Sequence, residues 1–88
     1  STDEDAAGTL DVATIEACLR GLVAEVRGMP LDQVRRDVAL AALGVDSAEA
    51  AHVAARLEAR LGRRVPLSLL VERPTLADVA AALSEIAA

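Results

Sequence analysis

The chain has no aromatic residue, and it contains only one cysteine and one histidine among its 88 residues. Without Phe, Tyr or Trp, a hydrophobic core has to be built from Leu, Val, Ile and Ala. The single thiol, that of Cys18, excludes an internal disulfide and any metal cluster built on several cysteines. Cys18 lies at helical spacing among apolar residues, which predicts a semi-buried structural thiol.

Basic residues and long apolar runs are also scarce. Nine basic residues against fourteen acidic ones give a net charge of −5. Binding to nucleic acid calls for clustered Lys and Arg, so we expect no nucleic-acid partner, whereas basic protein partners are permitted. No apolar run approaches the ~20 residues of a membrane span, and no signal peptide opens the chain. We therefore expect a cytoplasmic domain without membrane association, monomeric when isolated.

What the chain does contain is an abundance of alanine and leucine, both strong helix formers, which predicts an all-α protein. Its length predicts a single compact domain. A start at Ser1 rather than Met leads us to expect a segment of a longer protein. Residues 1–8 (STDEDAAG) are acidic and lack periodicity, which predicts a disordered linker before a folded domain at residues 9–88.

A first helix is predicted by apolar residues at gaps of three and four, and Gly28 is placed to end it. Gly21 in its middle costs about 1 kcal/mol relative to Ala. Either a neighbouring element approaches closely there, or the helix tolerates the loss. Residues 29–46 form a long connection with a short helical turn expected at residues 39–43. Its apolar residues are expected to attach it to the core: Leu31, Val34, Val38, Leu40 and Leu43.

Three further helices are predicted. The first of these runs from Ser47 to Leu61 and ends at Gly62. A short helix of one or two turns covers residues 67–71. The last helix begins at Pro74 and Thr75, where Thr75 and Asp78 resemble a capping box. The inward stripe of the second helix is Ala50, Val53, Ala54, Leu57 and Leu61, and that of the last is Leu76, Val79, Ala80, Leu83 and Ile86. The prediction is a four-helix bundle of three longer helices and a short third one.

The start of the second helix carries a candidate modification site. Gly44 permits a sharp turn, and Asp46 with Glu49 forms a predicted capping box, which leaves the hydroxyl of Ser47 free to project outward. Unpaired N–H groups and the positive end of the helix dipole would stabilise a phosphate ester on Ser47. Local chemistry alone favours the plainer interpretation, that Ser47 is an ordinary helix-start serine.

The segment LGVDS (residues 43–47) resembles the L-G-x-D-S signature of acyl carrier proteins, and the order of helices over residues 10–87 resembles theirs. RVPLSLLVERPTLADVAAAL is similar to the third and fourth helices of carrier domains in modular (type I) polyketide synthases, and RLEARLGRRVPL is similar to the end of their second helix. The resemblance implies a four-helix bundle of the acyl-carrier type.

The resemblance also implies a function. Ser47, supported by Asp46 and Gly44, would accept 4′-phosphopantetheine from coenzyme A through a phosphopantetheinyl transferase. The terminal thiol would carry acyl intermediates as thioesters to an acyltransferase or adenylating loading enzyme, a ketosynthase and other synthase domains. The domain would itself catalyse nothing, since His52 lies on a different helical face from Ser47 and no catalytic set or metal site can be assembled.

The outer face of the second helix would meet these partners. By the resemblance, its contact residues are Ala48, Ala51, His52, Ala55, Glu58 and Ala59. Ala48 departs from the leucine that the family usually has there. This small, weakly charged face predicts weak electrostatic steering and reliance on covalent tethering, although it could also pack against another domain.

Two other functions remain open from the residues. Peptidyl carrier domains of nonribosomal peptide synthetases are related, but they favour a second glycine where this chain has Val45. A helical docking or scaffold domain without any modification is the alternative of a different class.

Overall fold

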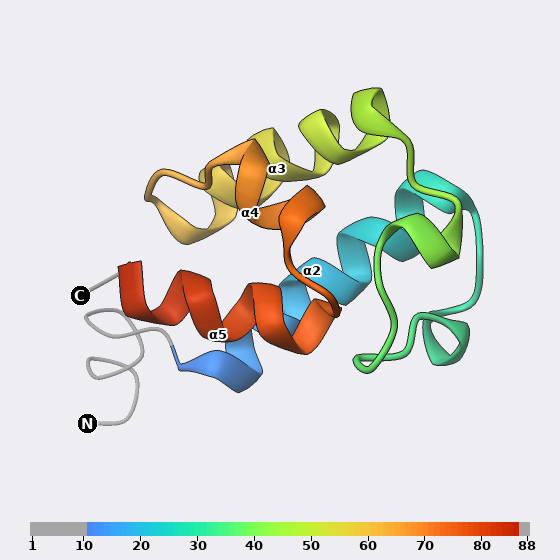
Figure 1. Cartoon of the computed structure of the whole chain (residues 1–88), viewed down its shortest axis with the longest axis horizontal. Coiled ribbons are helices and arrows are strands. Elements are labelled where there is room, and N and C mark those ends of the chain that lie inside the picture. The colour runs from blue at the N-terminus through green and yellow to red at the C-terminus, as the bar shows by residue number, and fades with distance from the viewer. Residues whose placement is uncertain (1–10, 87–88) are drawn as a thin grey trace.

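A computed structural model describes residues 11–86 as a compact all-helical domain (Figure 1), and the predicted linker at residues 1–8 lies outside the described part. Its α-helices are α2 (Val12–Arg27), α3 (Ser47–Leu61), α4 (Leu67–Glu72) and α5 (Leu76–Ile86), and the long connection holds two 3₁₀ helices, η1 (Leu31–Gln33) and η2 (Ala41–Leu43). The predicted bundle of three longer helices and one short helix is confirmed. None of the helices between residues 11 and 86 combines the length and the hydropathy of a membrane span.

Local hydrogen bonds set where the helices begin and end. Asp11 caps α2 by accepting the N–H of Thr14 at 2.8 Å, and Gly28 and Gly62 end α2 and α3 as predicted. The hydroxyl of Thr75 accepts the N–H of Asp78 at 3.1 Å and donates to the Asp78 carboxylate at 2.9 Å. Thr75 therefore caps α5 as expected. In a full capping box the Asp78 carboxylate would accept the backbone N–H of Thr75, whereas here it accepts the Thr75 hydroxyl.

The core is made where the apolar stripes of α2, α3 and α5 meet, with α2 packed against both others. The predicted stripe of α3 is buried in full, and Cys18 is half-buried as predicted. Within the described residues, every buried side chain is apolar. The other buried helical residues are Ile15, Leu19, Leu22, Val23, Leu70, Leu76, Val79, Ala80 and Leu83, whereas the side chain of Ile86 is outside the described part.

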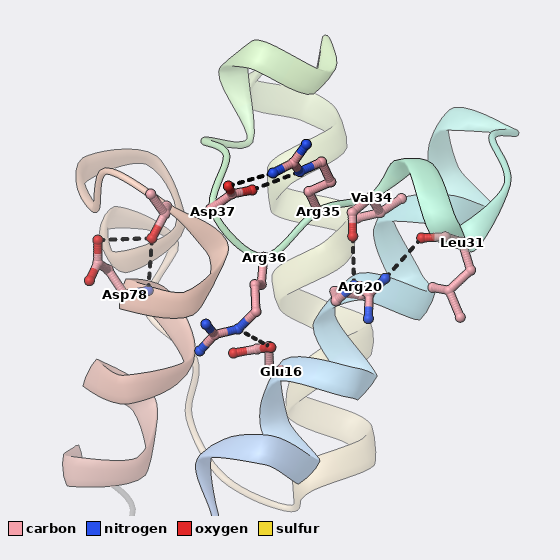
Figure 2. Close-up of polar contacts among 9 residues, drawn as sticks. Glu16, Arg20, Leu31, Val34, Arg35, Arg36, Asp37 and Asp78 are labelled. Carbon is pink, nitrogen blue, oxygen red and sulfur yellow. Dashed lines mark hydrogen bonds and ion pairs between the residues drawn. The ribbon is translucent and has the colours of Figure 1, made fainter.

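The first part of the long connection is held by an arginine of α2 (Figure 2). Arg20 donates from Nε to the carbonyl of Val34 at 2.6 Å and from Nη2 to the carbonyl of Leu31 at 3.0 Å. Val34 and Leu40 are buried as predicted, but Leu31 is 52% exposed, so its predicted role in the core is wrong. The backbone of residue 31 is fastened by Arg20 while its side chain turns to solvent.

The second part of the connection is held against the start of α5. The carbonyls of Arg36 and Val38 accept the N–H groups of Ala77 and Leu76, both at 2.9 Å. These donors belong to the first turn of α5, where no carbonyl of the same helix can reach them. The side chain of Arg36 also donates to Glu16 of α2 at 2.8 Å (Figure 2). The connection is thus an ordered layer across α2 and α5 that delivers the chain to α3.

Candidate functional site

The turn that precedes α3 is attached to the core on one side. After η2, the N–H of Gly44 donates to Ala41 and that of Val45 to Leu40, at 3.0 and 3.1 Å. The side chains of Leu40 and Val45 are buried. Gly44 has φ 84° and ψ 14°, in the left-handed region that residues with a Cβ rarely adopt. This turn places Asp46 at the N-cap position of α3.

Asp46 and Glu49 cap α3 reciprocally, as predicted. The Asp46 carboxylate accepts the N–H of Glu49 at 2.8 Å, and Glu49 Oε1 accepts the N–H of Asp46 at 3.2 Å. Ser47 is the first residue of the helix and is exposed. Its hydroxyl makes no hydrogen bond within residues 11–86, so the cap leaves this oxygen available for chemistry.

The surroundings of Ser47 fit a phosphate ester. The N–H groups of Ser47 and Ala48 have no acceptor within the described part of the chain, because the Asp46 carboxylate is bonded to Glu49. Free N–H groups at a helix start, together with the helix dipole, stabilise negative charge nearby. Both residues are exposed, which leaves room for a bulky group on the hydroxyl.

Sequence reasoning missed one residue of this site. Arg27, the last residue of α2, donates from Nη1 to Glu49 Oε2 at 3.0 Å and to Oε1 at 3.3 Å. Its guanidinium also lies over Gly44: a Cβ added there would stand 3.0 Å from Nη2. The sequence did contain a hint of this ion pair, because it has a cation at the end of one predicted helix and a carboxylate in the first turn of the next.

Five of the six predicted partner-contact residues lie together on the exposed face of α3: Ala48, Ala51, His52, Ala55 and Ala59. The sixth, Glu58, is half-buried and accepts the N–H of Val65 at 2.9 Å. Glu58 therefore holds the connection between α3 and α4. A substitution at Glu58 would disturb that connection as well as any partner contact.

The turn before α3 gives a testable prediction. Gly44→Ala should lower the free energy of unfolding by about 1–2 kcal/mol, because alanine is strained in the left-handed region and its Cβ would push against Arg27. Gly21→Ala is the matched control. Gly21 lies inside α2 with no heavy atom within 4 Å of an added Cβ, so no close approach explains it, and alanine there should raise the free energy by up to about 1 kcal/mol. Urea denaturation followed by far-ultraviolet circular dichroism measures both; equal effects at the two positions would contradict this account.

Comparison with known proteins agrees with this geometry. Residues 18–83 match the family described as "Phosphopantetheine attachment site". The chain is 32% identical to the non-reducing polyketide synthase nscA of Trichophyton rubrum, 37% to pkgA of Emericella nidulans and 38% to phnA of Penicillium herquei, the latter two also non-reducing polyketide synthases. The alignments cover 94%, 83% and 73% of this chain.

The same alignments cover only 5%, 4% and 3% of the three relatives, so the chain corresponds to a small segment of each. No solved structure matches the chain at a comparable level of significance. The family match covers most of the chain and includes the whole of α3, α4 and the long connection. The chain therefore belongs to the phosphopantetheine attachment-site family and is a carrier domain with a covalently attached phosphopantetheine arm.

Proposed function

We propose that this domain is the acyl carrier of a polyketide synthase and that Ser47 is the residue to which the phosphopantetheine arm is attached. One observation carries the assignment of the site. Ser47 presents an exposed hydroxyl at the first position of α3, while the neighbouring residues Asp46 and Glu49 satisfy the cap. A serine that capped the helix itself would have its oxygen occupied.

Each neighbour of Ser47 has a part in this proposal. Gly44 provides the turn, and Val45 fastens it to the core so that the serine is presented outward. The N–H groups of Ser47 and Ala48 face the position where the phosphate negative charge would be held. When bound, the arm supplies a terminal thiol that carries acyl groups as thioesters. The protein binds and presents the arm; the chemistry of chain building belongs to partner enzymes.

The proposed partners are a phosphopantetheinyl transferase, an acyltransferase or adenylating loading enzyme, and a ketosynthase, met through the exposed alanine-rich face of α3. The names of the relatives support a polyketide synthase. The assignment to a modular synthase is supported by the likeness of residues 64–83 to carrier domains of that class. We place the domain in the cytoplasm, where coenzyme A would supply the arm.

The attachment site can be located by mass spectrometry on a single peptide. Trypsin cleaves after Arg36 and Arg56, and the peptide 37–56 contains Ser47 as its one hydroxyl-bearing side chain. The protein is incubated with coenzyme A and a broad-specificity phosphopantetheinyl transferase, then digested. We expect the mass of one phosphopantetheine group to be added to this peptide.

Two other outcomes would contradict the proposal. If the added group appeared on a different peptide, the domain would remain a carrier but Ser47 would be the wrong site. If a folded, previously unmodified protein gained no mass at all, the carrier assignment of this chain would fail and an unmodified docking domain would be favoured.

A further inference from the structure

The start of α3 holds an excess of negative charge beside the proposed attachment site. Asp46 is the N-cap of α3 and Glu49 lies in its first turn, so the two carboxylates stand on either side of Ser47 in the sequence. A phosphodiester on Ser47 would add a third negative charge to this turn. Like charges this close repel one another. A nearby cation should therefore stabilise the loaded form more than the unloaded form.

Arg27 is the cation that the fold brings to this turn. Its side chain contacts Glu49 through two N–H···O distances of 3.0 and 3.3 Å, and its guanidinium rests on Gly44. It therefore touches the residues on both sides of Ser47. Only Nη1 donates within residues 11–86, so Nε and Nη2 keep N–H groups free, and the side chain is 37% exposed.

Other arginines of α3 are engaged further along the helix. Arg56 and Arg60 lie 3.9 and 3.8 Å from Glu25 of α2. Arg56 is nine residues beyond Ser47, about 13 Å along a helix that rises 1.5 Å per residue. Removing Arg56 therefore provides a matched control for removing Arg27: each loses one arginine charge and one contact with a glutamate.

We propose that Arg27 is a positioning residue that offsets negative charge in the loaded form of the domain. By pairing with Glu49 and packing on the Gly44 turn, it reduces the repulsion between the carboxylates at the start of α3 and a phosphodiester on Ser47. The inference rests on the proposed function, because it takes Ser47 as the attachment site. It assigns to the end of α2 a role in stabilising the arm-bearing form of the domain.

The test compares the thermal stability of unloaded and loaded protein at low salt. Arg27→Gln should lower the Tm of the loaded form by about 2–6 °C more than that of the unloaded form, the range expected for one lost charge interaction at a helix terminus in a domain of this size. Arg27→Lys keeps the charge and should remove most of that difference. Arg56→Gln should lower the Tm of the loaded and the unloaded form by the same amount. High salt should shrink the extra loss in Arg27→Gln, because it screens exposed charges.

Glu49→Gln provides a second variant with the opposite expected sign. Glutamine still accepts the capping hydrogen bond, so the helix start is preserved, but one negative charge beside the phosphodiester is removed. Relative to the unloaded form, the loaded form should gain stability. This variant keeps the inference testable if Arg27→Gln fails to fold.

The outcomes separate this inference from the proposed function. Intact mass first establishes which samples are loaded. If Ser47 is loaded but Arg27→Gln lowers both forms equally, or Glu49→Gln brings no relative gain, Arg27 has only a structural role and the inference is overturned. The ³¹P chemical shift of the phosphodiester gives an independent readout: we expect it to change in Arg27→Gln and not in Arg56→Gln. If Ser47 cannot be loaded at all, the proposed function fails, and the inference with it.

Discussion

Replacing Leu57 by alanine should lower the free energy of unfolding by about 2–5 kcal/mol, the range for removing a large aliphatic side chain from a packed core. Leu57 is 0% exposed and lies in the middle of the buried stripe of α3. The substitution would leave a cavity in the core. Because the protein has no aromatic residue, only aliphatic neighbours are available to fill it. Because small domains are stable by only about 5–15 kcal/mol, this one change removes a large share of the total.

Urea denaturation followed by circular dichroism is the suitable measurement, since the chain has no Trp or Tyr to report by fluorescence. Arg56→Ala is the control, because this neighbouring side chain is exposed and makes only a long, exposed ion pair of 3.9 Å with Glu25. Its removal should change the free energy of unfolding by no more than about 0.5 kcal/mol. A loss below about 1 kcal/mol in Leu57→Ala would mean that the core does not close around α3 as described.

Replacing Ser47 by alanine should abolish loading entirely while leaving the fold unchanged. The hydroxyl is the one group of peptide 37–56 that can form the phosphate ester, so no other side chain there can substitute for it. The helix should tolerate the change because Asp46 and Glu49 make the capping hydrogen bonds and Ser47 makes none of them. We expect a change in the free energy of unfolding within about 0.5 kcal/mol.

Ser68→Ala is the matched control for this experiment. Ser68 is an exposed serine in the first turn of α4, so it shares the residue type and the position near a helix start. It lacks the reciprocal cap and the glycine turn that precede Ser47, and its removal should leave loading unaffected. Residual loading of a folded Ser47→Ala protein would show that another residue accepts the arm.

The exposed face of α3 has a consequence for how partners would recognise the domain. Its predicted contact residues are mostly alanines, and Glu58, the one acidic member, is engaged by the backbone of Val65. We propose that long-range charge steering from this face is weak and that covalent tethering, which raises the effective concentration, is the main route to encounter. The alanines permit close approach of a partner helix without a large side chain to displace.

The helices, their caps and the exposure of Ser47 could be predicted from the order of residues along the chain. These features are local: apolar residues at gaps of three and four define a helix and its buried face, and Asp46 and Glu49 are three residues apart. The α3 stripe, the helical turn near residues 39–43 and the ends at Gly28 and Gly62 all follow from such spacing and are confirmed. The attachment of the arm at Ser47 stays a prediction.

The packing of the helices against one another sets which side chains hold the connections in place and which charged groups form ion pairs. Leu31 is exposed, and it is its backbone carbonyl that Arg20 of α2 holds. Glu58 is engaged because the chain returns after Gly62 to place the N–H of Val65 beside it. Arg27 and Glu49 are separated by 22 residues, and their contact depends on how α2 crosses α3. Spacing along the chain carries no information on such crossings, since they result from the packing of whole helices.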